Sequence, residues 1–254
     1  MSSSPIRDKA IGVLWPLLGG VSILALWYFV IIVFKVPDYI APAPHEVLKV
    51  VIDQFDLLVA NTIPTLQESV LGFLLGNGVA ILIAIMFVHN MTVSRMYYPI
   101  AILANTIPII AISPILVLIF GLGMAPKIVI SAIICFFPTL VNMIRGFNSI
   151  SHSELELMRI LSANKREVFW KLRMQRSLPF LFSALRIAST TCVIGAIVGE
   201  WIGSNLGLGA LIIQATFNYR SGLLYAAILG ASLLAITLFA IVVLLEKKFL
   251  RWTH

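Results

Sequence analysis

Residues 151–180 read SHSELELMRILSANKREVFWKLRMQRSLPF, a charged stretch that lies between long apolar runs. It holds nine of the chain's 18 basic and 11 acidic side chains. A soluble domain carries about 25% charged residues, whereas this chain of 254 residues is 11% charged and 60% hydrophobic. Its mean hydropathy of +1.01 fits an apolar solvent, the lipid bilayer. The stretch is therefore a polar connection in a membrane protein.

Six nearly uncharged runs are each long enough to cross a bilayer. A backbone in lipid must satisfy its own hydrogen bonds, so each run is predicted to be a helix. The predicted spans are about 13–34, 64–88, 97–121, 127–145, 179–203 and 222–245. The first run is longer than the apolar part of a cleaved signal peptide, which predicts a retained span. The fold class is thus all-α, a polytopic membrane protein with six transmembrane helices in a single domain over 1–254.

The distribution of lysine and arginine orients these spans. If both termini share one side of the membrane, that side holds 13 of these residues in its connections and the other side holds four. Basic residues concentrate in cytoplasmic loops, so both termini and the loop over 151–176 are predicted to be cytoplasmic. The net charge of +7 is thereby explained by membrane topology, and no nucleic-acid partner is expected.

Two capping signals give the charged loop an ordered structure. Ser153 precedes Glu156 by three residues, and Asn164 precedes Glu167 by three, the spacing of a capping box. The predicted helices are 154–161 and 165–173. A helix pair with exposed apolar residues is typical of a docking surface for a partner helix or groove. It is equally typical of a helix that rests on the inner leaflet, where basic residues favour anionic lipid.

The third apolar run contains ANTIPIIAISP, with prolines at positions 108 and 114. Proline removes a backbone hydrogen bond, which a membrane tolerates where protein or water satisfies the freed carbonyl. With Asn105, Thr106 and Ser113, this pattern predicts a bent helix that faces a water-accessible interior. The alternative is a kinked packing helix whose hydroxyls bond their own backbone.

Three charged residues fall inside the apolar runs, where charge is costly and often functional. Glu200 lies near the outer end of the fifth run, and we expect it to gate or to hold helices together by hydrogen bonds. Glu68, near the start of the second run, is expected to reach the same neighbourhood. Arg186 is expected to extend to the cytoplasmic face. The pathway or gating candidates are Asn105, Ser113, Glu200 and Glu68.

Small residues and one amphipathic segment predict how the helices pack. Gly72 and Gly76 are four residues apart, as are Gly195, Gly199 and Gly203, a spacing that lets helix backbones approach closely in lipid. After the first span, apolar residues recur at helical spacing over 47–58. This amphipathic helix either lies on the bilayer interface or offers a docking surface to an extracytoplasmic partner.

No pattern of catalytic or metal-binding residues is found in the sequence. It contains no G-x-x-x-x-G-K-[ST] phosphate loop, no H-E-x-x-H and no G-x-S-x-G. The four histidines form no cluster, and Cys135 and Cys192 have no metal or redox spacing. We expect no catalytic residue, no metal and no cofactor in this chain.

The stretch ELMRILSANKREVFWKLRMQ resembles the EAA loop of the permease subunits of ABC importers. Glu156 stands at the glutamate of that motif, Leu157 and Met158 at its two alanines, and Ser162 at its glycine. Met174-Gln175 stands where Leu-Pro is usual, although a later Leu178-Pro179 matches a second such pair. Glycine tolerates a positive φ, so the serine puts the elbow geometry in question.

Further segments resemble one subfamily, which imports nitrate, aliphatic sulfonates, taurine and thiamine-pyrimidine precursors. These segments are IGAIVGEWIGSNLGLGALI (194–212) and IPIIAISPILVLIFGLGMAPKI (107–128). The resemblance covers roughly residues 40 to 252 and is silent on the substrate. It implies a type I importer fold in the bacterial inner membrane, with a second permease copy as partner. A self-contained channel or secondary transporter is the alternative.

The same resemblance implies the other partners. Two cytoplasmic ATPase subunits, which carry ATP and Mg²⁺, would bind the loop over 151–176, and an extracytoplasmic protein would deliver the solute. ATP-driven closure of the ATPases would then tilt the spans between inward-facing and outward-facing states. The residues implied to contact the ATPases are Glu156, Leu157, Met158, Ser162, Ala163 and Asn164.

Overall fold

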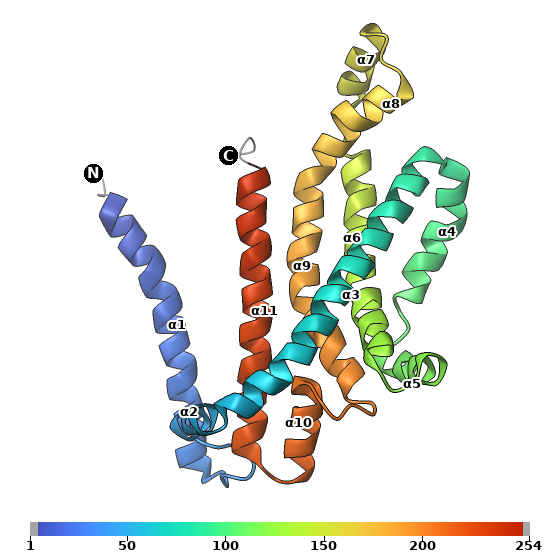
Figure 1. Ribbon diagram of the computed structural model, residues 1–254. Helices are drawn as coiled ribbons and strands as arrows, with labels where there is room; N and C mark the ends of the chain where they lie inside the picture. The colour runs from blue at the N-terminus through green and yellow to red at the C-terminus, as the bar shows by residue number, and fades with distance from the viewer. Residues whose placement is uncertain (1–4, 251–254) are drawn as a thin grey trace.

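The computed structural model describes residues 5–250, and every regular element in this range is a helix (Figure 1). The elements are α1 (Pro5–Phe34), α2 (Pro44–Asp53), α3 (Phe55–His89), α4 (Met91–Ala104), α5 (Ile109–Phe120), α6 (Met124–Asn148), α7 (His152–Ile160), α8 (Lys165–Glu167), the π-helix η1 (Val168–Arg173), α9 (Met174–Glu200), α10 (Leu208–Phe217) and α11 (Ser221–Phe249). Five helical segments are long and apolar enough to cross a membrane, and the bent pair α4–α5 would be a sixth. The predicted all-α membrane fold is confirmed.

Helices α3, α6 and α9 form the centre of the bundle. Helix α6 packs along both α3 and α9, and α11 packs against α9 and α10 (Figure 1). Helix α1 stands apart from this centre, and Trp27 stacks on Tyr225 of α11 with 5.6 Å between the ring centroids. Most of the described large apolar side chains of α1, from Leu14 onward, are exposed, as expected for a helix whose solvent is lipid.

Glycines allow the close approach of these central helices. A Cβ atom added to Gly195 would lie 2.6 Å from a backbone Cα of α6, and one added to Gly199 would lie 2.9 Å from another. Gly72 and Gly76 of α3 face α6 in the same way. The predicted contact role is confirmed for these four glycines. Gly203 lies in the loop after α9, where its φ of +73° favours glycine.

A Gly76→Ala substitution is expected to destabilise the bundle by about 1–3 kcal/mol, because the added methyl overpacks a contact that no rotamer can relieve. The new Cβ would lie 2.9 Å from the Cα of Ala132. Gly78, two residues along the same helix, has open space around it, so Gly78→Ala is the matched control. Thermal unfolding in detergent measures both. Equal melting temperatures for the two variants would contradict this packing.

The third predicted span is not one continuous helix. Helices α4 and α5 are separated by Asn105–Pro108 and bent by 100° with respect to each other. Pro108 immediately precedes α5 with an extended ψ of 121°, and a residue before proline is disfavoured in the α conformation, which ends α4. Pro114 lies inside α5 without breaking it. The bend predicted over 97–121 therefore falls at Pro108, whereas Pro99 lies inside α4.

Two other boundaries differ from the sequence prediction. Helix α3 begins at Phe55, well before residue 64, and runs through Pro64. The amphipathic segment over 47–58 is accordingly divided between α2 and the start of α3. Val47 of α2 is buried in the cluster that includes Leu223 of α11, so part of the apolar face packs on the bundle. Helix α10, only 10 residues long, was not predicted.

Candidate functional site

The charged loop forms a projection at one end of the bundle (Figure 1). Helix α7 points away from the bundle, the chain turns at 161–164, and α8 returns toward it. The separate second helix predicted over 165–173 is wrong in one respect, because α8 and η1 continue directly into α9. Residues Lys165–Glu200 thus form one apolar helical segment of 36 residues. The described ends of α1 and α11 lie at this same end of the molecule.

The first capping box lies two residues earlier than predicted. The Ser151 hydroxyl accepts a bond from the Glu154 amide at 3.2 Å, and the Ser151 amide donates to Glu154 Oε2 at 2.9 Å. The assignment to Ser153 and Glu156 is therefore wrong, because SHSELE contains two overlapping pairs with the same spacing. The earlier pair also lets Glu154 bond Arg176 of α9, a long-range contact that the local pattern does not contain.

The second capping box is confirmed. The Glu167 amide donates to Asn164 Oδ1 at 2.9 Å, and the Asn164 amide donates to Glu167 Oε2 at 3.0 Å. Asn164 is thus the residue that begins the return helix. Both α7 and the return helix therefore begin with a capping box, which satisfies early amides of each helix.

Ser162 occupies the elbow with a φ of +54°. The Ala163 amide donates to the Met158 carbonyl and the Ser162 amide to the Arg159 carbonyl, both at 2.9 Å. These two bonds are those of a Schellman motif, which normally places glycine at the left-handed position. The chain therefore adopts the turn that a glycine would favour. The left-handed conformation costs a residue with a Cβ atom about 1–2 kcal/mol.

Ser162→Gly is expected to slow hydrogen exchange of the α7 amides by up to about tenfold, because it removes that conformational cost. Ser162→Ala retains the Cβ atom and is the control, with exchange expected to stay near the wild-type rate. Exchange measured by mass spectrometry on the full chain in lipid nanodiscs tests both. Faster exchange in the glycine variant than in the alanine variant would contradict a strained elbow.

The tip of the projection exposes apolar side chains. Leu157, Ile160 and Leu161 are exposed, and Ile160 reaches 79%. Among the other residues implied to contact an ATPase, Glu156 and Ser162 are exposed, whereas Met158 and Ala163 are half-buried. Sequence comparison with the motif did not single out Ile160 or Leu161. Their exposure on a capped helix is the signal of a docking surface.

Three contacts fix the projection to the bundle. Arg173 Nη1 donates to the Phe147 carbonyl at the end of α6, at 2.8 Å. Phe169 is buried, and its ring lies 4.7 Å from the ring of His89 between centroids. Arg176 bonds the Glu154 carboxylate across the two arms. These contacts join the projection to α6, to the end of α3 and to α9.

The Arg176 guanidinium and the Ser151 amide lower the pKa of Glu154 from 4.5 to about 2. A lowered pKa means that the contact stabilises the loop above about pH 4.5 and is lost as the pH falls toward 2.

We expect the protection of the α7 amides against hydrogen exchange, corrected for the intrinsic exchange rate, to be equal at about pH 6 and about pH 8. Glu154→Gln should expose α7 to faster exchange at both pH values, whereas Glu156→Gln should not. Equal protection in the two variants would contradict this anchoring role.

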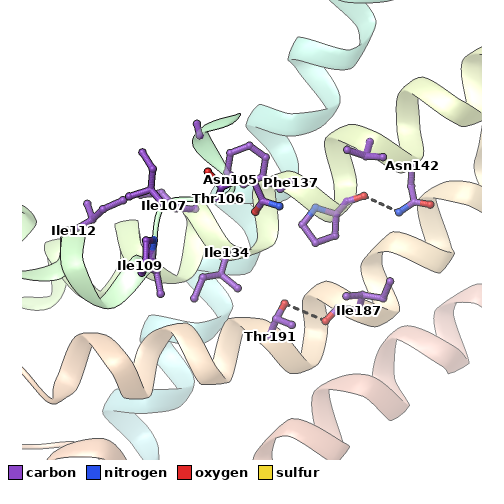
Figure 2. A pocket seen from close by; sticks show the side chains of 15 residues that line it. Asn105, Thr106, Ile107, Ile109, Ile112, Ile134, Phe137, Asn142, Ile187 and Thr191 are labelled. Carbon is purple, nitrogen blue, oxygen red and sulfur yellow. Dashed lines mark hydrogen bonds between the residues drawn. The ribbon is translucent and has the colours of Figure 1, made fainter. Parts of the chain in front are cut away.

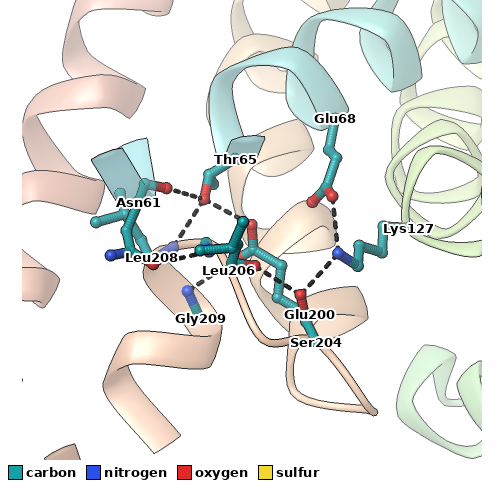
Figure 3. Close-up of polar contacts among 10 residues, drawn as sticks. Asn61, Thr65, Glu68, Lys127, Glu200, Ser204, Leu206, Leu208 and Gly209 are labelled. Carbon is teal, nitrogen blue, oxygen red and sulfur yellow. Dashed lines mark hydrogen bonds and ion pairs between the residues drawn. The ribbon is translucent and has the colours of Figure 1, made fainter. Parts of the chain in front are cut away.

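A buried polar cluster lies at the start of α10, at the end of the bundle opposite α7 (Figure 1), and Figure 3 shows its contacts. Glu68 of α3 and Glu200 of α9 are both almost fully buried. Lys127 at the start of α6 places its Nζ 2.9 Å from Glu68 Oε1 and donates to Ser204 Oγ at 2.7 Å. This ion pair links α3, α6 and the loop that follows α9.

Glu200 bonds to two different elements (Figure 3). Its Oε1 accepts from the Thr65 hydroxyl and its Oε2 from the Gly209 amide, both at 2.6 Å. The Thr65 oxygen in turn accepts from the Leu208 amide at 2.9 Å, and Asn61 Oδ1 accepts from the amide of the preceding residue, Gly207, at 3.0 Å. The first amides of α10, which lack partners in their own helix, are thereby satisfied by α3 and α9.

Sequence reasoning found the two acids of this cluster but not their partners. Lys127 entered the prediction only through the count of four basic residues on the side opposite the termini, and Asn61 and Thr65 were unremarkable polar residues. Long-range pairing carries no local signal, although a lysine at the edge of an apolar run was available as a cue. Arg186 likewise pairs with Glu246 of α11, with 3.3 Å between Nε and Oε2.

A cavity of about 640 Å³ opens where the α4–α5 bend meets α6 and α9 (Figure 2). Asn105 and Thr106 from the bend line it, together with Asn142 of α6 and Thr191 of α9. Apolar side chains, including Ile134 and Phe137, form the rest of the wall. Ser113 does not line it, since this residue is fully buried and donates to a carbonyl of its own helix at 3.2 Å. The structure therefore separates two residues that the sequence had grouped.

These features define a helical membrane protein with a projecting loop, and its described residues include no group of side chains that could hold a metal. The chain belongs to the family of binding-protein-dependent transport system inner membrane components, whose model matches residues 76–251. It is a permease subunit of an ABC importer. That family assignment agrees with the resemblance found in the loop and in the third and fifth spans.

Named relatives support the assignment over most of the chain. A probable ABC transporter permease protein of Haemophilus influenzae is 36% identical over 86% of this chain and 89% of its own length. The formylaminopyrimidine transport permease protein ThiX of Halalkalibacterium halodurans is 35% identical over 84% of this chain and 86% of its own. The riboflavin transport system permease protein RibX of Chloroflexus aurantiacus is 29% identical over 94% and 91%.

A solved structure shares the fold. One chain of the MetNI methionine ABC transporter, in an inward-facing conformation, superposes with a TM-score of 0.65. The match covers 78% of this chain and 97% of that chain at 19% identity. At this identity the likeness concerns the arrangement of helices.

Proposed function

We propose that two copies of this chain form the pathway of an ABC importer, with α7 as the element that cytoplasmic ATPase subunits grip. The single observation that carries the proposal is the exposed apolar tip of α7 on a doubly capped, bundle-anchored projection. The excess of basic residues at that end supports a cytoplasmic location for α7 and both termini. The membrane would be the bacterial inner membrane.

The continuous segment Lys165–Glu200 provides the mechanical connection. Its 36 residues span about 50 Å at the helical rise of 1.5 Å per residue. One end carries the elbow, and the other end carries Glu200, which bonds α3 and the start of α10. Movement of α7 on ATPase closure would therefore tilt α9 and move the buried cluster at the opposite end.

The chain itself supplies no chemistry in this proposal. It has no phosphate-binding loop, so ATP and Mg²⁺ belong to the partner ATPases, and the chain is not an enzyme. An extracytoplasmic binding protein would deliver the solute. The relatives are named for formylaminopyrimidine, riboflavin and aliphatic sulfonates, so the solute would be a small organic molecule of this range.

Purification of the tagged chain from its native membrane in mild detergent tests the proposal. The expected result is co-purification of an ATP-binding-cassette subunit, with lower recovery for Glu156→Ala. Glu156 is exposed and within α7 bonds only His152, at 3.2 Å, so the substitution leaves the bundle intact. No ATPase with either chain, together with ion-driven transport in liposomes that hold this chain alone, would establish the channel or secondary transporter instead.

A further inference from the structure

Helices α3, α6 and α9 meet closely at Ser131 of α6. A Cβ atom added to Gly195 of α9 would lie 2.6 Å from the Ser131 Cα, and Gly72 of α3 faces the Ser131 side chain with no more room. The Ser131 hydroxyl donates to the Cys192 carbonyl of α9 at 2.9 Å. Small residues let helix backbones approach in this way in a membrane. The three helices are therefore joined at the level of Ser131.

The buried polar cluster lies about one helical turn outward from Ser131. Its charged members are four or five residues from that contact along their own helices: Glu68 before Gly72, Lys127 before Ser131 and Glu200 after Gly195. Lys127 is held against α9, because a Cβ added to Gly199 would lie 2.9 Å from the Lys127 Cα. Its Nζ also donates to Ser204 in the loop after α9. Movement of α9 and the start of α6 away from α3 at this end would thus separate Lys127 from Glu68.

Glu68 depends on Lys127 for compensation of its charge (Figure 3). The Glu68 side chain is fully buried, and its Oε2 has no hydrogen-bond donor among the described residues. The Lys127 ammonium lies 2.9 Å from Oε1. Glu200, by contrast, accepts two hydrogen bonds at 2.6 Å. A buried carboxylate that loses its partner charge is costly, and it becomes neutral by taking up a proton.

No other charged side chain in the described surroundings of Glu68 can replace Lys127. These two residues are the charged ones in the lining of the adjoining pocket of about 370 Å³. Helices α5 and α10 contain no Asp, Glu, Lys, Arg or His. Glu200 interacts electrostatically with Glu68, but its charge has the same sign. His45, at this end of the bundle, bonds Tyr28 of α1 and does not line the pocket.

Water can reach the ion pair from the end of the bundle opposite α7. Gln67 and Asn205 line the same pocket as Glu68 and Lys127, and both of these amide side chains are exposed. The Lys127 side chain itself keeps 12% of its surface exposed. A proton therefore has a short path from the solvent to the Glu68 carboxylate.

We infer that Glu68 is a proton-binding site that couples opening of this outer end of the bundle to the extracytoplasmic pH. In the closed state Glu68 is ionised and paired with Lys127. On opening, Lys127 moves into water and keeps its charge, while Glu68 stays among apolar residues such as Pro64 and Val117 of the pocket. One proton from water forms an O–H bond at the Glu68 carboxylate. The inference rests on the proposed importer function, which supplies the movement of α9.

The open state binds one proton more than the closed state, so a lower pH favours opening. The ratio of open to closed chains is expected to rise by up to about tenfold for each unit by which the pH falls, because one proton is taken up. A glutamine at position 68 is neutral at every pH. It leaves Lys127 without its partner, which favours the open state, and it removes the dependence on pH.

Distances between two spin labels test the inference in the full chain in lipid nanodiscs. Gln67→Cys on α3 and Asn205→Cys in the loop after α9 carry the labels, because these exposed residues lie on one pocket and would separate on opening. Cys135 and Cys192 are fully buried, which keeps them from the label. Dilution with unlabelled chain restricts the measurement to pairs within one chain. Each sample is measured at about pH 8 and about pH 5, a range over which one bound proton has a large effect.

The unsubstituted Glu68 chain is expected to show a short distance at the higher pH and a growing population with a longer distance at the lower pH. Glu68→Gln should show the longer distance at both pH values. Glu156→Gln, the same change at an exposed acid of the projection, should behave like the chain with Glu68. The double variant Glu68→Gln with Lys127→Met lacks both charges and should also be independent of pH. It provides the same test if the single variant does not fold.

Two results would overturn the inference. A dependence on pH that persists in the Glu68→Gln chains would place the proton elsewhere, and a distance that never changes with pH in the Glu68 chain would show that opening takes up no proton. Recovery of the ATPase subunit with the unsubstituted chain is measured separately. Normal recovery together with either result refutes the proton site alone, whereas absence of the ATPase refutes the importer function itself.

Discussion

Lys127→Met is expected to lower the free energy of unfolding by about 3–5 kcal/mol, because it leaves the buried Glu68 carboxylate without its partner charge. Glu68 is fully buried, and Lys127 Nζ is its ion-pair partner at 2.9 Å. The substitution also removes the bond to Ser204, which lies in the loop after α9. Thermal unfolding in detergent and the yield of folded protein measure the loss.

A second substitution separates the charge effect from general damage. Glu68→Gln in the Lys127→Met chain removes the uncompensated charge and is expected to recover a substantial part of the lost stability. Lys165→Met, at an exposed lysine of the projection, is the matched control and should melt like the wild type. If the Lys127→Met and Lys165→Met variants unfold at the same temperature, the ion pair does not hold this end of the bundle together.

Ile160→Asp is expected to lower recovery of the ATPase subunit by about 30-fold or more, the effect of removing an interface hot spot. The Ile160 side chain is 79% exposed. An aspartate at this position is therefore solvated in the free chain, and the substitution has little effect on folding stability. At the interface it would bury a charge in an apolar groove, which is unfavourable unless the charge is paired. The measured quantity is ATPase subunit recovered per permease after mild-detergent purification.

Phe217→Asp provides the control at the opposite end of the bundle. Phe217 is equally exposed, at 77%, and ends α10. Its substitution is expected to leave ATPase recovery unchanged. Equal losses in the two variants would indicate a general solubility effect, and no loss in Ile160→Asp would place the ATPase contact elsewhere.

The sequence predicted those parts of the fold that rest on local signals. Uniform apolar runs located the long helices, and the Asn164–Glu167 pair located the start of the return helix, because a capping box is contained within four residues. The same rule failed at Ser153, where an overlapping pair two residues earlier was also available. A contact across the loop, between Glu154 and Arg176, favours the earlier pair.

The candidate sites were predicted less well, since they depend on contacts between distant segments. Glu200 and Glu68 were conspicuous because charge in an apolar run is costly, but Thr65 reaches Glu200 across 135 residues of chain. Asn105 and Ser113 share one polar pattern, yet the bend at Pro108 places only Asn105 in the cavity. The 100° bend between α4 and α5 separates these two residues, and the spacing of residues in the sequence does not predict that angle.

Site-specific photo-crosslinking from α7 tests the central claim most directly. A benzophenone attached to Ile160→Cys, in the full chain and its native membrane, is predicted to form a covalent adduct with an ATP-binding-cassette ATPase subunit. The same label on Phe217→Cys, at the other end of the bundle, is predicted to form none. Labelled Ile160→Cys without an ATPase adduct, while the folded chain is recovered in normal yield, would contradict the assignment of α7 as the ATPase-coupling element.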